Sequence, residues 1–199
     1  MSETTHRRDG PEPSSPAAPS AAEARVDISV WSGRGFLNVR LDPRCAQAVE
    51  AAARALGQPL PLAANTFTAG RHHVCWLGPD EWLIVTDRQR AAGLGRDLAE
   101  ALAGSHAAVN DISGGQVALR ISGVDARTVL AKGCTLDLHP SAFAPPQCAQ
   151  TGLAKATVLL SALDGASTYA IIVRRSFSDY LYRWLAHAAR PHGVGSGML

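Results

Sequence analysis

The sequence predicts an α+β protein: two tandem units with mostly antiparallel sheets, packed as one body. Short segments of alternating hydrophobicity are interspersed with longer segments of helical period, in the order β-α-β-β-α-β, and much of that order then repeats. The chain has 199 residues, which suits one ordinary domain or two small ones in close contact. The connection 111–115 between the halves is too short for a flexible linker.

The first unit is predicted over residues 26–115. Asp42-Pro43 marks a helix start, because proline is favoured at the first helical position, and Gly57 marks its end. Gly78-Pro79-Asp80-Glu81 has proline at the second position of a turn and joins two strands. The predicted strands are 36–41, 73–77, 82–86 and 107–112, and the predicted helices are 45–56 and 87–102.

The second unit is predicted over residues 116–190. Asp164-Gly165 joins two strands as a hairpin, and Ser176 with Asp179 resembles a capping box at the start of the last helix. The predicted strands are 116–121, 149–153, 157–163 and 168–173, and the predicted helices are 124–132 and one beginning at 176.

The two ends of the chain are predicted to be unstructured. Residues 1–25 are rich in proline, alanine and serine, which favours a disordered arm. Residues 191–199 hold three glycines, typical of a flexible tail. Arg7-Arg8 is followed by no apolar segment, so no secretory signal is expected, and we expect a cytoplasmic protein with reduced cysteines.

The composition excludes several classes of protein. The 46% hydrophobic content excludes a wholly disordered chain, and no apolar run reaches the roughly 20 residues of a membrane span. The net charge of +2 is spread without basic runs, which argues against a nucleic-acid partner. Charged residues make up 18%, below the usual ~25%, which hints that part of the surface meets a protein partner.

A search for chemistry predicts no catalytic, cofactor-binding or metal site in this chain. The phosphate-binding glycine motifs and the nucleophile elbow do not occur. Cys134, His139 and Cys148 match no zinc spacing. His72 and His73 would point to opposite faces of a strand, so they cannot chelate one metal, and we expect them at the surface or at an edge.

Six residues remain as candidate interface or fold anchors. The two tryptophans flank one turn as cross-strand neighbours, for core packing or for an interface. The two acids at the turn tip are a solvated turn or, given a cleft, an acid/base pair. The two arginines stand between a strand and a helix, where they could hold an anion or partner carboxylate, remain solvated, or form an internal ion pair. The six are Trp76, Asp80, Glu81, Trp82, Arg174 and Arg175.

Several segments, in this order, resemble the gamma subunit of heterotetrameric sarcosine oxidase over roughly residues 30–190. They are 76–83 (WLGPDEWL), 111–113 (DIS), 119–123 (LRISG), 132–140 (KGCTLDLHP), 148–151 (CAQT) and 174–180 (RRSFSDY). The wider resemblance is to the glycine-cleavage T-protein and its folate-binding relatives. It implies ferredoxin-like and related α+β units, in agreement with the tandem order.

The chain departs from the T-protein pattern where that family gathers its catalytic and folate contacts. Pro145-Pro146-Gln147 stands where that pattern has Pro-Gly-Gln, and the hairpin 153–160 (LAKATVLL) holds no acidic residue. A folate amine with developing charge needs a carboxylate nearby. We therefore expect that this copy of the fold is not a catalytic folate site.

The resemblance implies a non-catalytic structural subunit. The implied complex demethylates sarcosine oxidatively to glycine with peroxide, and transfers the methylene group to tetrahydrofolate when it is present. FAD, FMN, NAD, tetrahydrofolate and zinc would be bound by other subunits and none by this chain. The implied partners are the alpha, beta and delta subunits, chiefly the large folate-binding one.

Two alternatives stay open. A free-standing folate-dependent aminomethyltransferase-like protein would bind tetrahydrofolate by itself. A nucleic-acid-binding module would bind RNA in a salt-dependent way, which the scattered arginines disfavour.

Overall fold

The computed structural model describes residues 25–165 and 167–196. The helices are α1 (Ala46–Leu56), α2 (Arg88–Ala101), α3 (Ala126–Ala131) and α4 (Arg175–Ala189), followed by a 3-10 turn, η1 (Arg190–His192). The strands are β1 (Val26–Val30), β2 (Arg34–Leu41), β3 (Phe67–Ala69), β4 (His73–Gly78), β5 (Glu81–Asp87), β6 (Ala107–Asp111), β7 (Gln116–Ser122), β8 (Cys148–Leu153), β9 (Ala156–Ala162), β10 (Thr168–Arg174) and β11 (Val194–Ser196).

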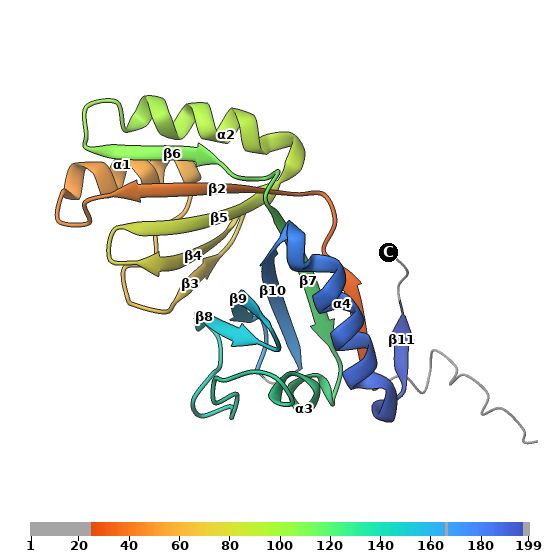
Figure 1. Cartoon of the computed structure of the whole chain (residues 1–199). Helices are drawn as coiled ribbons and strands as arrows, with labels where there is room; N and C mark the ends of the chain where they lie inside the picture. Colours follow the sequence, from red (N-terminus) through yellow and green to blue (C-terminus); the bar gives the residue numbers. More distant parts are fainter. Residues whose placement is uncertain (1–24, 166, 197–199) are drawn as a thin grey trace, which may run out of the picture.

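The first sheet is five-stranded and antiparallel, in the order β3-β4-β5-β2-β6. Side chains alternate between the faces of a strand, and one face of this sheet packs against α1 and α2 (Figure 1). Their apolar stripes, among them Ala52 and Leu56 of α1 and Leu98 of α2, meet Leu37 and Ile84 of the sheet. α1 ends where the sequence predicts, because Gly57 adopts the left-handed conformation at its C-cap.

The second sheet is six-stranded, in the order β11-β1-β7-β10-β9-β8. Its described pairs are antiparallel except for β1 with β11, which run parallel. α3 and α4 pack on one face through Val129, Leu130, Leu181 and Leu185. Because α4 follows directly from β10, it folds back across this face.

The two sheets pack against each other through their remaining faces. Phe36 and Leu83 of the first sheet share an apolar cluster with Ala118, Leu159 and Ile172 of the second. The order of layers is therefore helices, sheet, sheet, helices. This confirms the predicted α+β class with mostly antiparallel sheets packed as one body.

Three short strands were not predicted, and two of them change the division of the chain. β1 precedes β2 but lies in the second sheet, beside β7. The tail predicted to be flexible over residues 191–199 contains the last two residues of η1 and the whole of β11, and β11 pairs with β1. The structure therefore differs from that prediction within residues 191–196. Residues 1–24 of the predicted disordered arm lie outside the described residues.

Two further predictions are also wrong. The last helix begins at Arg175 with Arg174 as its N-cap and no side-chain cap, so Ser176 is not the capping residue. Asp179 instead pairs with Arg183 one turn later, at 3.1 Å. His72 and His73 were expected at the surface or an edge, but only 5% and 6% of them is exposed.

Gly35 sets the distance between β2 and α2. A Cβ at this position would lie 2.6 Å from the Cβ of Ala91 and 3.3 Å from the Cα of Arg88, both on the helix. We expect Gly35→Ala to lower the free energy of unfolding by about 1–3 kcal/mol, the usual cost of overpacking. Gly93→Ala is the matched control, because its Cβ would meet open space; within a helix it should stabilise by about 1 kcal/mol. Urea denaturation of both variants measures the difference, and equal effects would contradict the close approach.

Candidate interaction surface

The hairpin of β4 and β5 places the two candidate tryptophans opposite each other. Trp76 pairs with Trp82 across the strands, as predicted from the turn between them. Trp82 is fully buried, and its indole nitrogen donates a hydrogen bond to the carbonyl oxygen of Pro61 at 2.8 Å. Trp76 is half-buried. Of the pair, only Trp76 has surface to offer another protein, whereas Trp82 belongs to the core.

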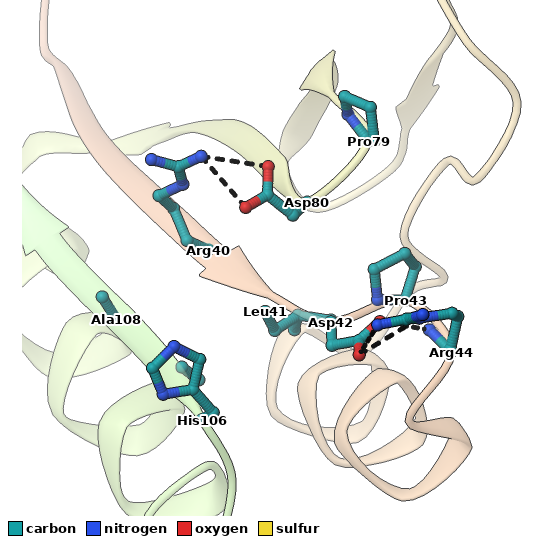
Figure 2. Close-up of a pocket in the computed structure, with 10 residues that line it drawn as sticks. Arg40, Leu41, Asp42, Pro43, Arg44, Pro79, Asp80, His106 and Ala108 are labelled. Atoms are coloured by element: carbon teal, nitrogen blue, oxygen red, sulfur yellow. Dashed lines mark hydrogen bonds and ion pairs between the residues drawn. The ribbon is translucent and has the colours of Figure 1, made fainter.

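Asp80 lies in an open groove of about 680 Å³ at the tip of this hairpin (Figure 2). One nitrogen of the Arg40 guanidinium lies 3.0 Å from both oxygens of Asp80, and this pairing raises the pKa of Arg40. Asp42 is bound by Arg44 at 2.9 Å, which lowers the pKa of Asp42. Both carboxylates of this groove are therefore paired with a neighbouring arginine, as in a solvated turn.

Glu81 points to a second cavity, of about 500 Å³, which we call the inter-sheet cavity. Its apolar lining comes from both sheets, and its polar lining includes Gln116, Thr157, Lys155 and Arg174. The Glu81 carboxylate accepts a hydrogen bond from the Asn38 side-chain amide at 2.7 Å. The full lining is Asn38, Leu77, Glu81, Leu83, Ile112, Gln116, Gln150, Lys155, Thr157, Val158, Leu159, Ile172, Arg174 and Phe177.

The two adjacent arginines have different surroundings. Arg175 donates from its guanidinium to the carbonyl oxygen of Gly114 at 2.7 Å, and its backbone nitrogen donates to Gly115. It therefore ties the start of α4 to the connection between the sheets. Arg174 is exposed and lines the inter-sheet cavity. The structure brings Glu81 and Arg174 to one cavity and leaves Asp80 in the other groove.

A polar cluster that the sequence did not predict lies between the sheets. His73 Nε2 is 3.1 Å from the Ser161 hydroxyl, and the Cys75 sulfur is 3.7 Å from the same oxygen. The His73 ring packs on Phe67 at 4.4 Å between centroids. Burial lowers the pKa of His73 to about 4 and raises that of Cys75.

This cluster lies inside the packing between the sheets. Ser161 is fully buried, His73 is 6% exposed, and neither of them lines the groove or the inter-sheet cavity. No local motif could have announced it, because the two residues are 88 positions apart. Within residues 25–165 and 167–196, no three His, Cys, Asp or Glu side chains gather as a metal site would require.

Residues 40–190 match the model of the sarcosine oxidase gamma subunit family. The chain belongs to this family. It is 36% identical over 153 residues to a sarcosine oxidase subunit gamma of Arthrobacter sp., covering 76% of this chain and 74% of the relative. The subunit gamma of Corynebacterium sp. (strain U-96) is 31% identical over 193 residues, with 94% and 93% covered.

The solved structures agree with this membership of the gamma family. A chain of the heterotetrameric sarcosine oxidase from Corynebacterium sp. U-96, in complex with pyrrole 2-carboxylate, matches with a TM-score of 0.79 and 30% identity, covering 89% of this chain and 90% of that one. The glycine-cleavage aminomethyltransferase T of Bartonella henselae matches with a TM-score of 0.61 and 16% identity, covering 87% of this chain and 48% of that one. This second likeness shows a shared fold.

Across the described residues, no helix is both long and apolar enough to cross a bilayer.

Proposed function

We propose that this chain is a non-catalytic structural subunit of a heterotetrameric sarcosine oxidase in the cytoplasm. The observation that carries the proposal is the match to a chain of that heterotetramer over 89% of this chain. The partners would be its alpha, beta and delta subunits, chiefly the large folate-binding one. The complex would oxidise sarcosine to glycine with peroxide and transfer the methylene group to tetrahydrofolate.

The chemistry of such a reaction would be carried by the partners, with FAD, FMN, NAD, tetrahydrofolate and zinc bound there. Two features of this chain support a structural role. The Ser161–His73 pair, which has the residue types of a nucleophile and base, is closed off by the two sheets. The carboxylate of Asp80 forms an ion pair with Arg40. This pairing suits a solvated turn and does not suit an acid/base pair. Trp76 and Arg174 would contribute to contacts with partners, while Trp82 and Arg175 would hold the fold.

Co-expression with the neighbouring subunits tests this proposal. Native mass spectrometry is expected to find a complex that contains this chain together with the alpha, beta and delta subunits. The purified chain by itself is expected to produce no peroxide from sarcosine. Sarcosine oxidation by the chain alone, or the absence of any complex, would overturn the proposal.

One observation favours a second candidate, a folate-dependent aminomethyltransferase-like protein. The hairpin of β8 and β9 lacks an acid, but Glu81 supplies a carboxylate to the inter-sheet cavity from the other sheet. Calorimetry with tetrahydrofolate decides between the two. The structural role predicts no heat of binding for the isolated chain, and saturable binding that Glu81→Gln abolishes would support the transferase.

A further inference from the structure

The inter-sheet cavity carries an unbalanced positive charge on the six-stranded sheet. β9 and β10 pair with Val158 opposite Val173, which places Arg174 opposite Thr157. Ile172 and Leu159 point into the cluster between the sheets. Because side chains alternate along a strand, Arg174 at the end of β10 continues this same face. Lys155 lies in the turn just before β9 and also lines the cavity.

Arg174 and Lys155 therefore both line the inter-sheet cavity from the same end of the six-stranded sheet. Like charges on neighbouring strands repel each other. Within the described chain, neither the Arg174 guanidinium nor the Lys155 ammonium has an ion-pair partner. The acid of the cavity, Glu81, comes from the opposite sheet and is bound by Asn38.

Exposed aromatic side chains border this positive pair. Phe177, which lines the cavity, is 41% exposed, and Tyr180 is 37% exposed one turn further along α4. The backbone nitrogen of Lys155 donates to the Tyr180 hydroxyl at 3.3 Å, which joins the turn between β8 and β9 to the helix. Figure 1 shows the end of β10 and the start of α4 directed towards the five-stranded sheet.

Arginine and aromatic side chains are the residue types that most often carry the binding energy of protein interfaces. Two cations without counter-ions beside an apolar floor favour a ligand that brings carboxylates and apolar groups together. A chain segment with aspartate or glutamate next to apolar residues has this chemistry, and an arginine guanidinium can bind a carboxylate through two parallel hydrogen bonds.

We propose that an acidic segment of another subunit docks in the inter-sheet cavity, pairing its carboxylates with Arg174 and Lys155 and covering Phe177 and Tyr180. This inference rests on the proposed function, since it names the place and the chemistry of one contact within the complex. Covering the aromatic side chains removes apolar surface from water, and the ion pairs orient the segment.

The lysine content of the chain makes a direct test possible. Lys132 and Lys155 are the two lysines in the sequence. A carbodiimide joins a lysine ammonium to a carboxylate in contact with it, as an amide bond. We expect cross-linking of the assembled complex, followed by digestion and mass spectrometry, to link Lys155 to an Asp or Glu of another subunit.

Two controls accompany the cross-link. Lys132 already donates to the carbonyl oxygen of Ala188 at 2.6 Å and contacts His192 at 3.1 Å, so we expect no link from it to another subunit. Lys155→Arg keeps the charge and should assemble normally while losing the cross-link. An intact complex in which Lys155 stays unlinked would overturn the docking inference alone, whereas a chain that forms no complex would overturn the proposed function as well.

Affinity measurements give a second and independent readout. We expect Arg174→Gln to weaken binding to the partner subunits at least tenfold and to reduce its salt dependence. Arg183→Gln, on the helix that follows Arg174, is the matched control, because Arg183 is exposed and pairs with Asp179 outside the cavity. Equal affinities for the two variants would contradict the inference. Equal affinities are also expected if a small anion fills the cavity, because its loss would leave assembly unchanged in both variants.

Discussion

Replacing Trp82 with alanine is expected to lower the free energy of unfolding by about 3–5 kcal/mol, the range for truncating a large buried aromatic residue. The side chain has no exposed surface and packs among Leu37, Ile84 and the helices above them. Its removal would leave a cavity. It would also leave the carbonyl oxygen of Pro61 without the hydrogen bond that the indole nitrogen donates at 2.8 Å. Urea denaturation followed by circular dichroism measures the loss.

Trp76 provides the matched control, because it lies directly across the hairpin from Trp82 and is half-buried. Trp76→Ala should cost clearly less stability, since part of its surface is in contact with water in the folded chain. Trp82→Phe separates the two contributions of Trp82, because it keeps much of the apolar volume but removes the hydrogen-bond donor. If Trp76→Ala and Trp82→Ala destabilise equally, the division into a surface and a core tryptophan is wrong.

The hairpin also shows what local sequence can predict. Gly78-Pro79-Asp80-Glu81 marks the turn, and the alternation on both sides predicts the strands and the pairing of the tryptophans, all of which the structure contains. Such signals arise within a few residues of chain. The same reason explains why the long helices α1, α2 and α4 are found where the sequence predicts them, apart from a few terminal residues.

Strands held by distant partners carry no comparable signal. β1 and β11 pair with Val26 opposite Val194, across nearly the whole chain, and β11 has three residues. The position of β11 depends on the surrounding contacts: Asp125 binds both Arg25 and His192 near the start of β1 and the end of η1. A glycine-containing tail of this length has no periodicity that could distinguish a strand from a free end.

The candidate residues also combine local and long-range information. The sequence predicts the two acids at a turn and the two arginines at the end of a strand, but it does not predict that Asp80 lies in one groove while Glu81 and Arg174 line another cavity. Glu81 and Arg174 meet at the inter-sheet cavity because the two sheets pack face to face. The burial of His72 and His73 could not be predicted either, because polar residues before a strand usually mark its exposed end.

Acidification is expected to destabilise the chain between about pH 6.5 and pH 4 because of His73. An unperturbed histidine has a pKa of about 6.5, and burial between the sheets lowers that of His73 to about 4. The unfolded chain therefore binds the proton more tightly than the folded chain, so stability falls as the pH drops through this window. The full shift corresponds to about 3 kcal/mol at pH 4 and below, where the loss levels off. The pKa of His72 is also lowered, mainly by burial, and adds a loss of the same sign.

A variant without the titrating ring separates His73 from the other groups. His73→Gln should reduce the pH dependence of the unfolding free energy between pH 6.5 and pH 4. His106→Gln, the same substitution at an exposed position, serves as the matched control. Asp125 does not contribute to the pH dependence between pH 6.5 and pH 4. Its hydrogen bond with Arg25 lowers its pKa to about 2, so its contribution to stability is lost only below about pH 3.8. If His73→Gln and the unaltered chain lose stability in parallel from pH 6.5 to pH 4, then His73 takes up its proton in the folded state at an ordinary pH. That result would mean that water reaches the Ser161–His73 pair between the two sheets, in contradiction to its burial in this structure.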